Sequence, residues 1–152
     1  MKTSYIITFI GDDRPGLVEQ LSSVIENNGG NWHESRLSQL GGKFAGLILV
    51  SLPADTGPAL EADLGALAAS GLSVRVTPTS DKKAPVPGRD ITLTVLGPDR
   101  PGIVREISSA LALRQINVLE MDSQVDSAAM SAEMIFRASI KAWTPEKTDL
   151  ED

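Results

Sequence analysis

An internal repeat constrains the fold of this 152-residue chain more than any other feature. Residues 10–18 read Ile-Gly-Asp-Asp-Arg-Pro-Gly-Leu-Val, and residues 96–104 read Leu-Gly-Pro-Asp-Arg-Pro-Gly-Ile-Val, at an offset of 86. When residues 5–52 are compared without a gap at this offset, eleven of the 48 positions are identical. Length alone favours one domain, but the repeat predicts two copies of one small unit.

The first copy has the pattern of a β-α-β-β-α-β unit. Apolar residues alternate over 5–10, which is a strand period, and recur at helical spacing over 17–25. The pattern then predicts a strand over 31–40, a hairpin turn at Gly41 and Gly42, a strand over 44–52, a helix around 60–67 and a strand over 72–76. This order predicts an α+β, ferredoxin-like fold with an antiparallel sheet. The poorly alternating strand 31–40 is expected at the sheet edge.

The chain is predicted to contain two domains, residues 1–78 and 90–152. Residues 79–89 are rich in proline and poor in apolar residues, so we expect a semi-rigid linker there. At the offset of 86, the second helix of the second unit is expected over about 143–156. The second unit is therefore expected to lack the end of its last helix and its last strand.

Composition excludes several classes of site. The chain has no cysteine and one histidine, His33, so thiol chemistry and a multi-histidine metal site are not expected within one chain. The net charge is −6, shared equally between residues 1–78 and 79–152, and no basic half favours direct DNA binding. No segment approaches the ~20 apolar residues of a membrane span. We expect a cytoplasmic protein that starts without a signal peptide.

The turn between the first strand and first helix of each unit is the candidate site. Gly16 and Gly102 allow close approach of a ligand, and the following helix start offers unpaired N–H groups that suit a carboxylate. Asp13 and Asp99 suit an ammonium group. Pro15 and its counterpart are expected as first helical residues. These residue types therefore fit a free amino acid, although the same residues also start a helix without any ligand.

The Asp-Arg-Pro-Gly sequence after a strand, followed by an apolar helix and an Asn before the next strand, resembles the ACT domain. Two such units are similar to the glycine cleavage system transcriptional repressor family. The resemblance implies regulatory domains that bind amino acids and pair side by side through an edge strand, with the ligand at that interface. It also implies action through a DNA-binding protein partner, a transcription regulator of glycine cleavage genes. No cofactor and no metal are expected.

Carried onto this chain, the resemblance places ligand contacts in both loops, with an asparagine of each edge strand facing the ligand across the interface. The implied ligand-binding positions are Gly11, Asp13, Arg14, Pro15, Gly16, Leu17 and Asn31 in the first unit, and Gly97, Asp99, Arg100, Pro101, Gly102, Ile103 and Asn117 in the second. The pairing is expected within a homo-oligomer or within one chain.

No catalytic residue is expected. His33 aligns with Leu119 in the repeat, and Glu34 and Glu120 are expected to face solvent or a partner strand. We therefore expect a non-enzymatic regulatory protein. Two alternatives stay open: an interaction module without a ligand, and a regulatory fragment of an enzyme of amino-acid or one-carbon metabolism.

Overall fold

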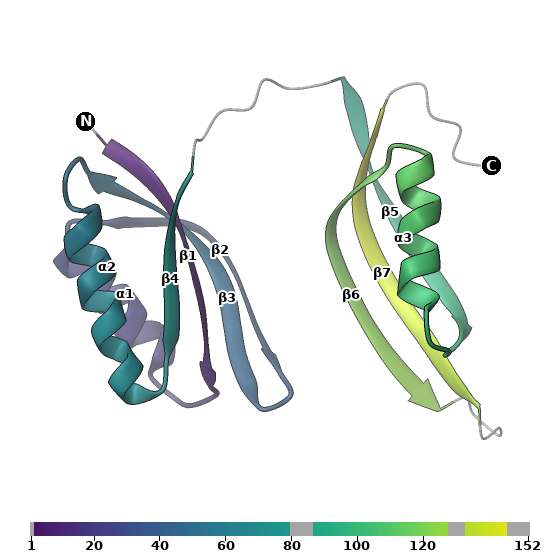
Figure 1. The fold of residues 1–152 in the computed structure, drawn as a ribbon, viewed down its shortest axis with the longest axis horizontal. Helices are drawn as coiled ribbons and strands as arrows, with labels where there is room; N and C mark the ends of the chain where they lie inside the picture. The colour runs from purple at the N-terminus through teal and green to yellow at the C-terminus, as the bar shows by residue number, and fades with distance from the viewer. Residues whose placement is uncertain (1, 80–86, 128–132, 146–152) are drawn as a thin grey trace. The chain divides into compact units, whose positions relative to one another are not determined.

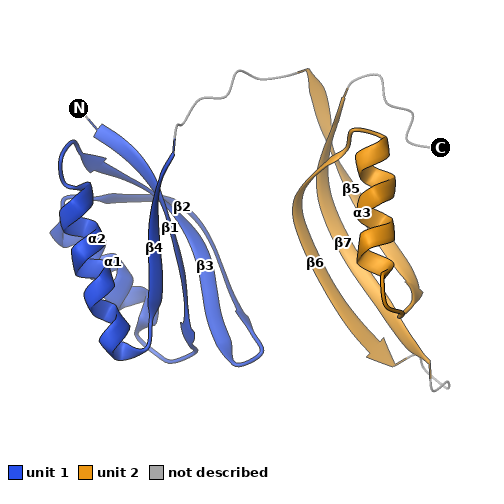
Figure 2. Ribbon diagram, in the orientation of Figure 1, with its two compact units in different colours: residues 1–83 blue, residues 84–152 orange. Residues whose placement is uncertain are grey.

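The computed structural model describes residues 2–79, 87–127 and 133–145. The chain forms two compact units, unit 1 (Met1–Lys83) and unit 2 (Ala84–Asp152) (Figure 2). Residues 80–86, at the centre of the predicted linker, lie outside the described residues. The flanking strands reach Thr79 on one side and begin at Gly88 on the other, so they include the ends of the segment proposed as a linker.

Unit 1 has the element order that the repeat predicts. It contains β1 (Lys2–Asp12), α1 (Leu17–Asn27), β2 (Asn31–Leu40), β3 (Lys43–Pro53), α2 (Gly57–Gly65), the 3₁₀ helix η1 (Ala66–Ser70) and β4 (Ser73–Thr79). The antiparallel sheet has the strand order β2-β3-β1-β4, and both α-helices cover one face of it (Figure 1). The prediction that β2 is an edge strand is confirmed.

The core of unit 1 lies between the sheet and its helices. Alternate residues of the central strands, such as Ile7 and Ile48, face α1 and α2 and are fully buried. They pack with residues at helical spacing, and the buried set is Ile7, Phe9, Leu17, Leu21, Ile25, Ile48, Val50, Leu52, Leu60, Leu64 and Leu72. The apolar residues that recur at strand period and those that recur at helical period therefore pack into one core.

The hairpin between β2 and β3 also forms where it was predicted. Gly41 and Gly42 have φ angles of 61° and 79°, which suit the two-residue hairpin turns that glycine favours. At the other end of β2, the register shifts between Trp32 and Glu34, so His33 is the extra residue of a β-bulge.

Unit 2 repeats the first part of this fold. It contains β5 (Gly88–Pro98), α3 (Ile103–Leu113), β6 (Asn117–Ser127) and β7 (Met134–Pro145), with the antiparallel order β5-β7-β6. The bulge recurs at Leu119, between Val118 and Glu120. The two edge strands therefore share one local distortion although the bulged residues differ.

The offset of 86 without a gap is wrong for the residues that follow the connection between β6 and β7. Gly11 pairs with Phe44 in unit 1, and Gly97 pairs with Phe136 in unit 2, so the offset becomes 92 for the third strand. The cause is a longer hairpin connection, because Leu40 pairs with Lys43 whereas Ser127 pairs with Met134.

The expected helix over 143–156 is corrected by the same shift. Trp143 to Pro145 belong to β7, and Pro145 corresponds to Pro53 at the end of β3. Residues 146–152 lie outside the described part of the chain. In the described part of unit 2, α3 buries its apolar face less completely: Leu17 and Leu21 of α1 are buried, whereas Ile103 and Ile107 are only partly buried.

Candidate functional site

The loop between β1 and α1 is built around a turn that requires glycine. Gly16 and Gly102 have φ angles of 89° and 87°, and each follows a proline. Proline followed by a left-handed glycine is the pattern of a type II turn. In unit 2 this turn is closed by a hydrogen bond from Ile103 N–H to the Arg100 carbonyl at 3.3 Å.

This turn corrects the expected position of the prolines. Both helices begin after the glycine, at Leu17 and Ile103, so Pro15 and Pro101 are turn residues and not the first helical residues. No side chain caps either helix start. The proline ring fixes the first half of the turn, and the helix starts only after the chain has reversed at glycine.

The hairpin of each unit holds its loop in place. The Asp13 N–H donates to the Gly42 carbonyl at 3.2 Å, and the Asp99 N–H donates to the Met134 carbonyl at 2.9 Å. In unit 1 Lys43 also forms an ion pair with Asp12, and this cation lowers the pKa of Asp12. The loop is therefore anchored at one end of the sheet in both units.

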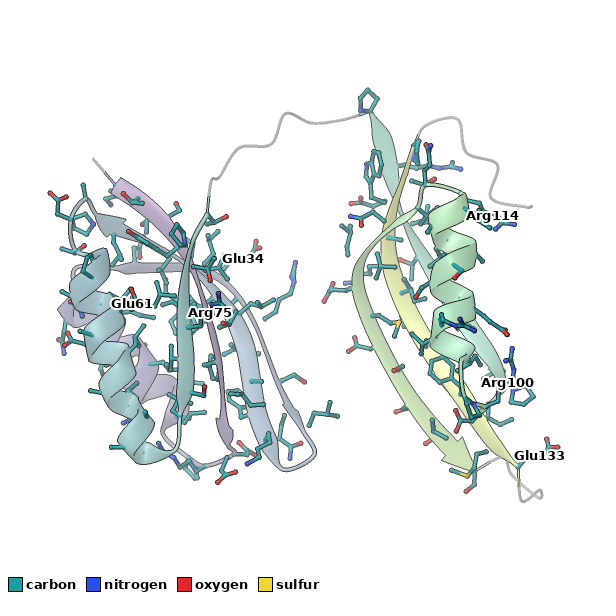
Figure 3. The ribbon with its side chains drawn as sticks, in the orientation of Figure 1. Glu34, Glu61, Arg75, Arg100, Arg114 and Glu133 are labelled. Carbon is teal, nitrogen blue, oxygen red and sulfur yellow. The ribbon has the colours of Figure 1, made fainter. Side chains whose placement is uncertain are left out.

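The loop arginine of each unit lies back over the first turns of the helix. Arg14 Nη2 donates to Gln20 Oε1 at 3.0 Å. Arg100, which Figure 3 labels near the start of α3, donates to both carboxylate oxygens of Glu106. Gln20 and Glu106 are equivalent positions at the offset of 86. The hydrogen bond and charge of Arg100 lower the pKa of Glu106, and Glu106 raises that of Arg100.

The two loops consequently differ in charge. Arg14 pairs with a neutral amide, whereas Arg100 pairs with a carboxylate. The adjacent position differs in the opposite sense, because Glu19 of unit 1 stands where unit 2 has Arg105.

An open depression of about 330 Å³ lies beside the loop of unit 1. The residues that line it are Asp13, Arg14, Gly16, Leu17, Val18, Glu19 and Phe44. The first turn of α1 leaves backbone N–H groups without intrahelical acceptors, and Leu17 to Glu19 carry them here. The depression thus combines amide donors and a guanidinium with the carboxylates of Asp13 and Glu19 and the ring of Phe44.

These groups are complementary to a zwitterion. Amide donors at a helix start and an arginine bind a carboxylate, and an exposed aspartate attracts an ammonium group. Neither Asp13 nor Asp99 forms a side-chain hydrogen bond with another described residue that would occupy it.

The predicted asparagines lie elsewhere in each unit. Asn31 pairs with Ser51, which in turn pairs with Ser4, whereas Asp12 at the loop pairs with Lys43. The two rows are eight residue steps apart along β1, about 27 Å at the rise of a strand. Asn117 occupies the same position at the start of β6. The structure therefore does not bring either asparagine to the loop of its own unit.

Three contributors to the site were not singled out in the sequence. Gln20 and Glu106 stand six residues after the loop arginines, a spacing that becomes a contact only because of the intervening turn. Phe44 of β3 reaches the depression because the hairpin lies against the loop. The centroid of its ring lies 5.9 Å from the centroid of the Phe9 ring. In the sequence, the hairpin glycines that precede Phe44 were the signal from which its position beside the loop could have been predicted.

Away from the loops, Lys2, His33 and Glu34 line a second open depression of about 560 Å³ together with Ser4, Leu49 and Ser51. His33 Nε2 lies 2.7 Å from Ser51 Oγ at the far end of the sheet, and Glu120 pairs with Lys141 at 3.5 Å. Among the described residues, no group of three or more metal-ligating side chains is present. No helix in the described ranges is long and apolar enough to cross a bilayer.

Comparisons with known proteins identify the same two units. An ACT domain family model matches residues 3–77, and a second ACT domain model matches residues 91–141. A protein of Escherichia coli strain K12 named glycine cleavage system transcriptional repressor is 25% identical over 146 residues, covering 95% of this chain and 76% of the relative. The protein of that name from Shigella flexneri gives the same values.

Two solved structures resemble the whole chain. The crystal structure of an unknown protein from Galdieria sulphuraria matches with a TM-score of 0.78 and 30% identity, over 95% of this chain and 84% of the other. A crystal structure of a protein assigned as a candidate glycine cleavage system transcriptional repressor matches with a TM-score of 0.72 and 23% identity, over 99% of this chain and 86% of the other. At 23% identity, the match to this second structure supports the fold alone.

Proposed function

Because this chain belongs to the ACT domain family, with one ACT domain in each unit and a regulatory role, we propose that it is a non-enzymatic sensor of a small amino acid. The ligand binds at the loop of unit 1, with glycine as the first candidate. In the bound form the protein modulates a partner in the cytoplasm, a transcription regulator of glycine cleavage genes.

One observation carries the proposal: the depression beside α1 places carboxylate-binding and ammonium-binding groups together. Leu17 to Glu19 contribute free N–H groups, Arg14 contributes a cation with a neutral partner, and Asp13 contributes an unengaged carboxylate. The depression is open, and Phe44 forms part of its wall. Its polar groups suit the ammonium and carboxylate that all amino acids share, and glycine is the first candidate because of the relatives' name.

The partner is proposed from the relatives. The similar Escherichia coli protein is named a transcriptional repressor of the glycine cleavage system. The net charge of −6 disfavours direct contact with DNA, so control through a DNA-binding protein is the simpler route. A ligand that binds one arrangement of the ACT domains more tightly shifts the population towards it, and the partner responds to that shift.

The proposal assigns no catalytic step. General acid–base catalysis needs groups with a pKa near the working pH. The shifted carboxyl groups near the loops, Asp12 and Glu106, have their pKa values lowered by adjacent cations, so both are more firmly ionised at neutral pH. They are suited to ion pairing and not to proton transfer.

The edge-strand pairing implied by the ACT resemblance gives Asn31 a place in the proposal. The loop lies at the hairpin end of β2, and Asn31 lies at the other end of the same edge strand. If two edge strands pair antiparallel, the start of one lies beside the hairpin end of the other. Asn31 of one ACT domain then approaches the loop of its neighbour.

A scan of thermal unfolding with the twenty amino acids tests this function. A ligand at 100 times its dissociation constant adds about 2.7 kcal/mol, which raises the melting temperature by several degrees. We expect a selective rise with glycine or a near analogue, which Asp13→Asn reduces and the matched variant Asp99→Asn affects less. No rise with any amino acid would reject ligand sensing and leave a protein-interaction module.

A further inference from the structure

The sheet face of unit 1 that points away from the helices carries an unexpectedly apolar patch. Strand residues alternate between the two faces, so the residues next in sequence to the helix-facing ones point outwards. We call Ile6, Ile10, Ala45, Leu47 and Leu49 the open-face patch. Ile6 pairs with Leu49 and Ile10 with Ala45, and Thr8 pairs with Leu47 between them, so the patch is uninterrupted on β3 and flanked on β1 by two isoleucines. Ile10 and Leu47 are each 49% exposed.

The duplicated sheet in unit 2 is an internal control for this patch. Its register is the same, because Thr92 pairs with Lys141 where Ile6 pairs with Leu49, and Thr94 pairs with Ser139 where Thr8 pairs with Leu47. Four of the five patch positions therefore change from apolar to polar. The replacements for Ile6, Ala45, Leu47 and Leu49 are Thr92, Arg137, Ser139 and Lys141, and Leu96 replaces Ile10.

Because the two units share one fold, their differences show which apolar residues of the sheet the fold itself requires. Both units keep apolar residues on the helix-facing side of their central strands. The polar open face of unit 2 is the ordinary condition of an antiparallel sheet with one solvated face. Exposed aliphatic groups at the same positions of unit 1 gain nothing for the fold and favour burial against another surface.

The charges that flank the patch suit a second copy of it. Glu34, which Figure 3 labels, and Arg36 follow each other on the outward face of β2, paired with Leu49 and Leu47. If two open faces pack with β2 over β2 and the strands antiparallel, a two-fold axis at Ser35 sets Glu34 opposite Arg36 of the partner subunit. The same axis repeats the pair, so the surface is complementary to itself in charge.

The patch also has a shape that accepts side chains. A hollow of about 130 Å³ lies on it, with Ile6, Leu47 and Leu49 in its wall and with Glu34 and Arg36 at its edge. Aliphatic side chains of an opposing patch can enter this hollow, as in the interdigitated layers of packed β-sheets. A charged face such as that of unit 2 would instead bury lysine and arginine against aliphatic groups.

We propose that the open-face patch of unit 1 is a dimerisation surface that packs on the same sheet face of a second copy of this chain, with Leu47 opposite Leu49 of the partner subunit. The two sheets pack face to face about a two-fold axis, with Glu34 and Arg36 forming reciprocal ion pairs at the margin. This surface is separate from the edge of β2 and from the loop, so it leaves both free for the proposed function.

Sedimentation equilibrium of the full chain over micromolar concentrations tests the surface. The variant Leu47→Ser with Leu49→Lys introduces the residues that unit 2 tolerates at the same positions. We expect a wild-type dimer and a rise of about 100-fold or more in its dissociation constant for this variant, because four leucines leave the interface. The control Leu113→Lys changes a residue that is 84% exposed on α3, and we expect no change.

A charge cycle tests the arrangement without changing the apolar residues. Glu34→Arg and Arg36→Glu each set like charges opposite one another, and we expect either to raise the dissociation constant about fivefold. The double reversal restores opposite charges and the wild-type value. A monomeric wild type, or a dimer that Leu47→Ser with Leu49→Lys does not weaken, overturns the proposed surface. Failure of the double reversal to restore affinity overturns the two-fold arrangement.

Discussion

Arg14 donates a hydrogen bond to the amide oxygen of Gln20 at 3.0 Å, and this contact distinguishes the two loops of the molecule. In unit 2 the equivalent pair is an ion pair between Arg100 and Glu106. One side-chain difference therefore leaves a cation available at one loop and compensates it at the other.

The first prediction exchanges these two pairs. Gln20→Glu introduces a carboxylate that competes for Arg14, so we expect amino-acid affinity to fall about two- to fivefold, as is typical of an exposed pair. Titration calorimetry measures the change. Glu106→Gln serves as the matched variant, because it frees Arg100, and it should leave affinity equal or higher. A higher affinity in Gln20→Glu would exclude Arg14 from carboxylate binding.

The second prediction concerns the pH dependence of stability at Glu106. Arg100 holds the pKa of Glu106 below its ordinary value of 4.5 in the folded state. A lowered folded pKa adds stability above the ordinary value, and this contribution disappears as the pH falls through the lowered pKa. The stability difference between wild type and Glu106→Gln should therefore be present at neutral pH and shrink below about pH 4.5. Urea unfolding at stepped pH measures it, and a difference that grows in acid would contradict the assigned ion pair.

The third prediction tests the turn. Gly16→Ala forces a side chain onto a residue with φ 89°, and we expect a loss of about 1–2 kcal/mol in the free energy of unfolding. Gly65→Ala is the control, because Gly65 has φ −59° and no atom within 4 Å of an added Cβ. Alanine is favoured at such a helical position, so Gly65→Ala should be neutral or stabilising. Equal losses in both variants would argue against the left-handed turn.

The fourth prediction uses the repeat as its own control. A Cβ at Gly11 would lie 2.8 Å from Cδ1 of the buried Leu72, whereas a Cβ at Gly97 meets nothing within 4 Å. Gly11→Ala should destabilise the protein by about 1–3 kcal/mol through overpacking. Gly97→Ala should have little effect, and chemical denaturation compares the two. A larger loss at Gly97 would contradict the described packing.

Much of unit 1 was predictable because its signals are local. Alternation predicted β1, and a continuous apolar run that ends at Pro53 predicted β3. Helical spacing predicted α1, and the glycine pair predicted the hairpin. The position of Pro15 was wrong because proline fits both the first turn of a helix and a type II turn. Only the φ angle of Gly16 separates these cases.

The limits of the repeat were not predictable from its identities. All identical positions at the offset of 86 lie between Thr8 and Glu34, so they do not show where the hairpin of unit 2 ends. At the offset of 92, which strand pairing establishes, Phe44, Ile48 and Pro53 match Phe136, Ile140 and Pro145. The contact between Arg14 and Gln20 also depends on the turn between them, and the ligand positions themselves stay a prediction.

The most direct test of the central claim is nuclear magnetic resonance of backbone amides during titration with glycine. The account predicts that the largest shift changes occur at the amides of Gly16, Leu17, Val18 and Glu19, with smaller changes at Gly102 and Ile103. Asp13→Asn should weaken the response at the same amides. Shift changes centred away from the β1–α1 loop, or none at saturating glycine and its near analogues, would contradict amino-acid binding at this site.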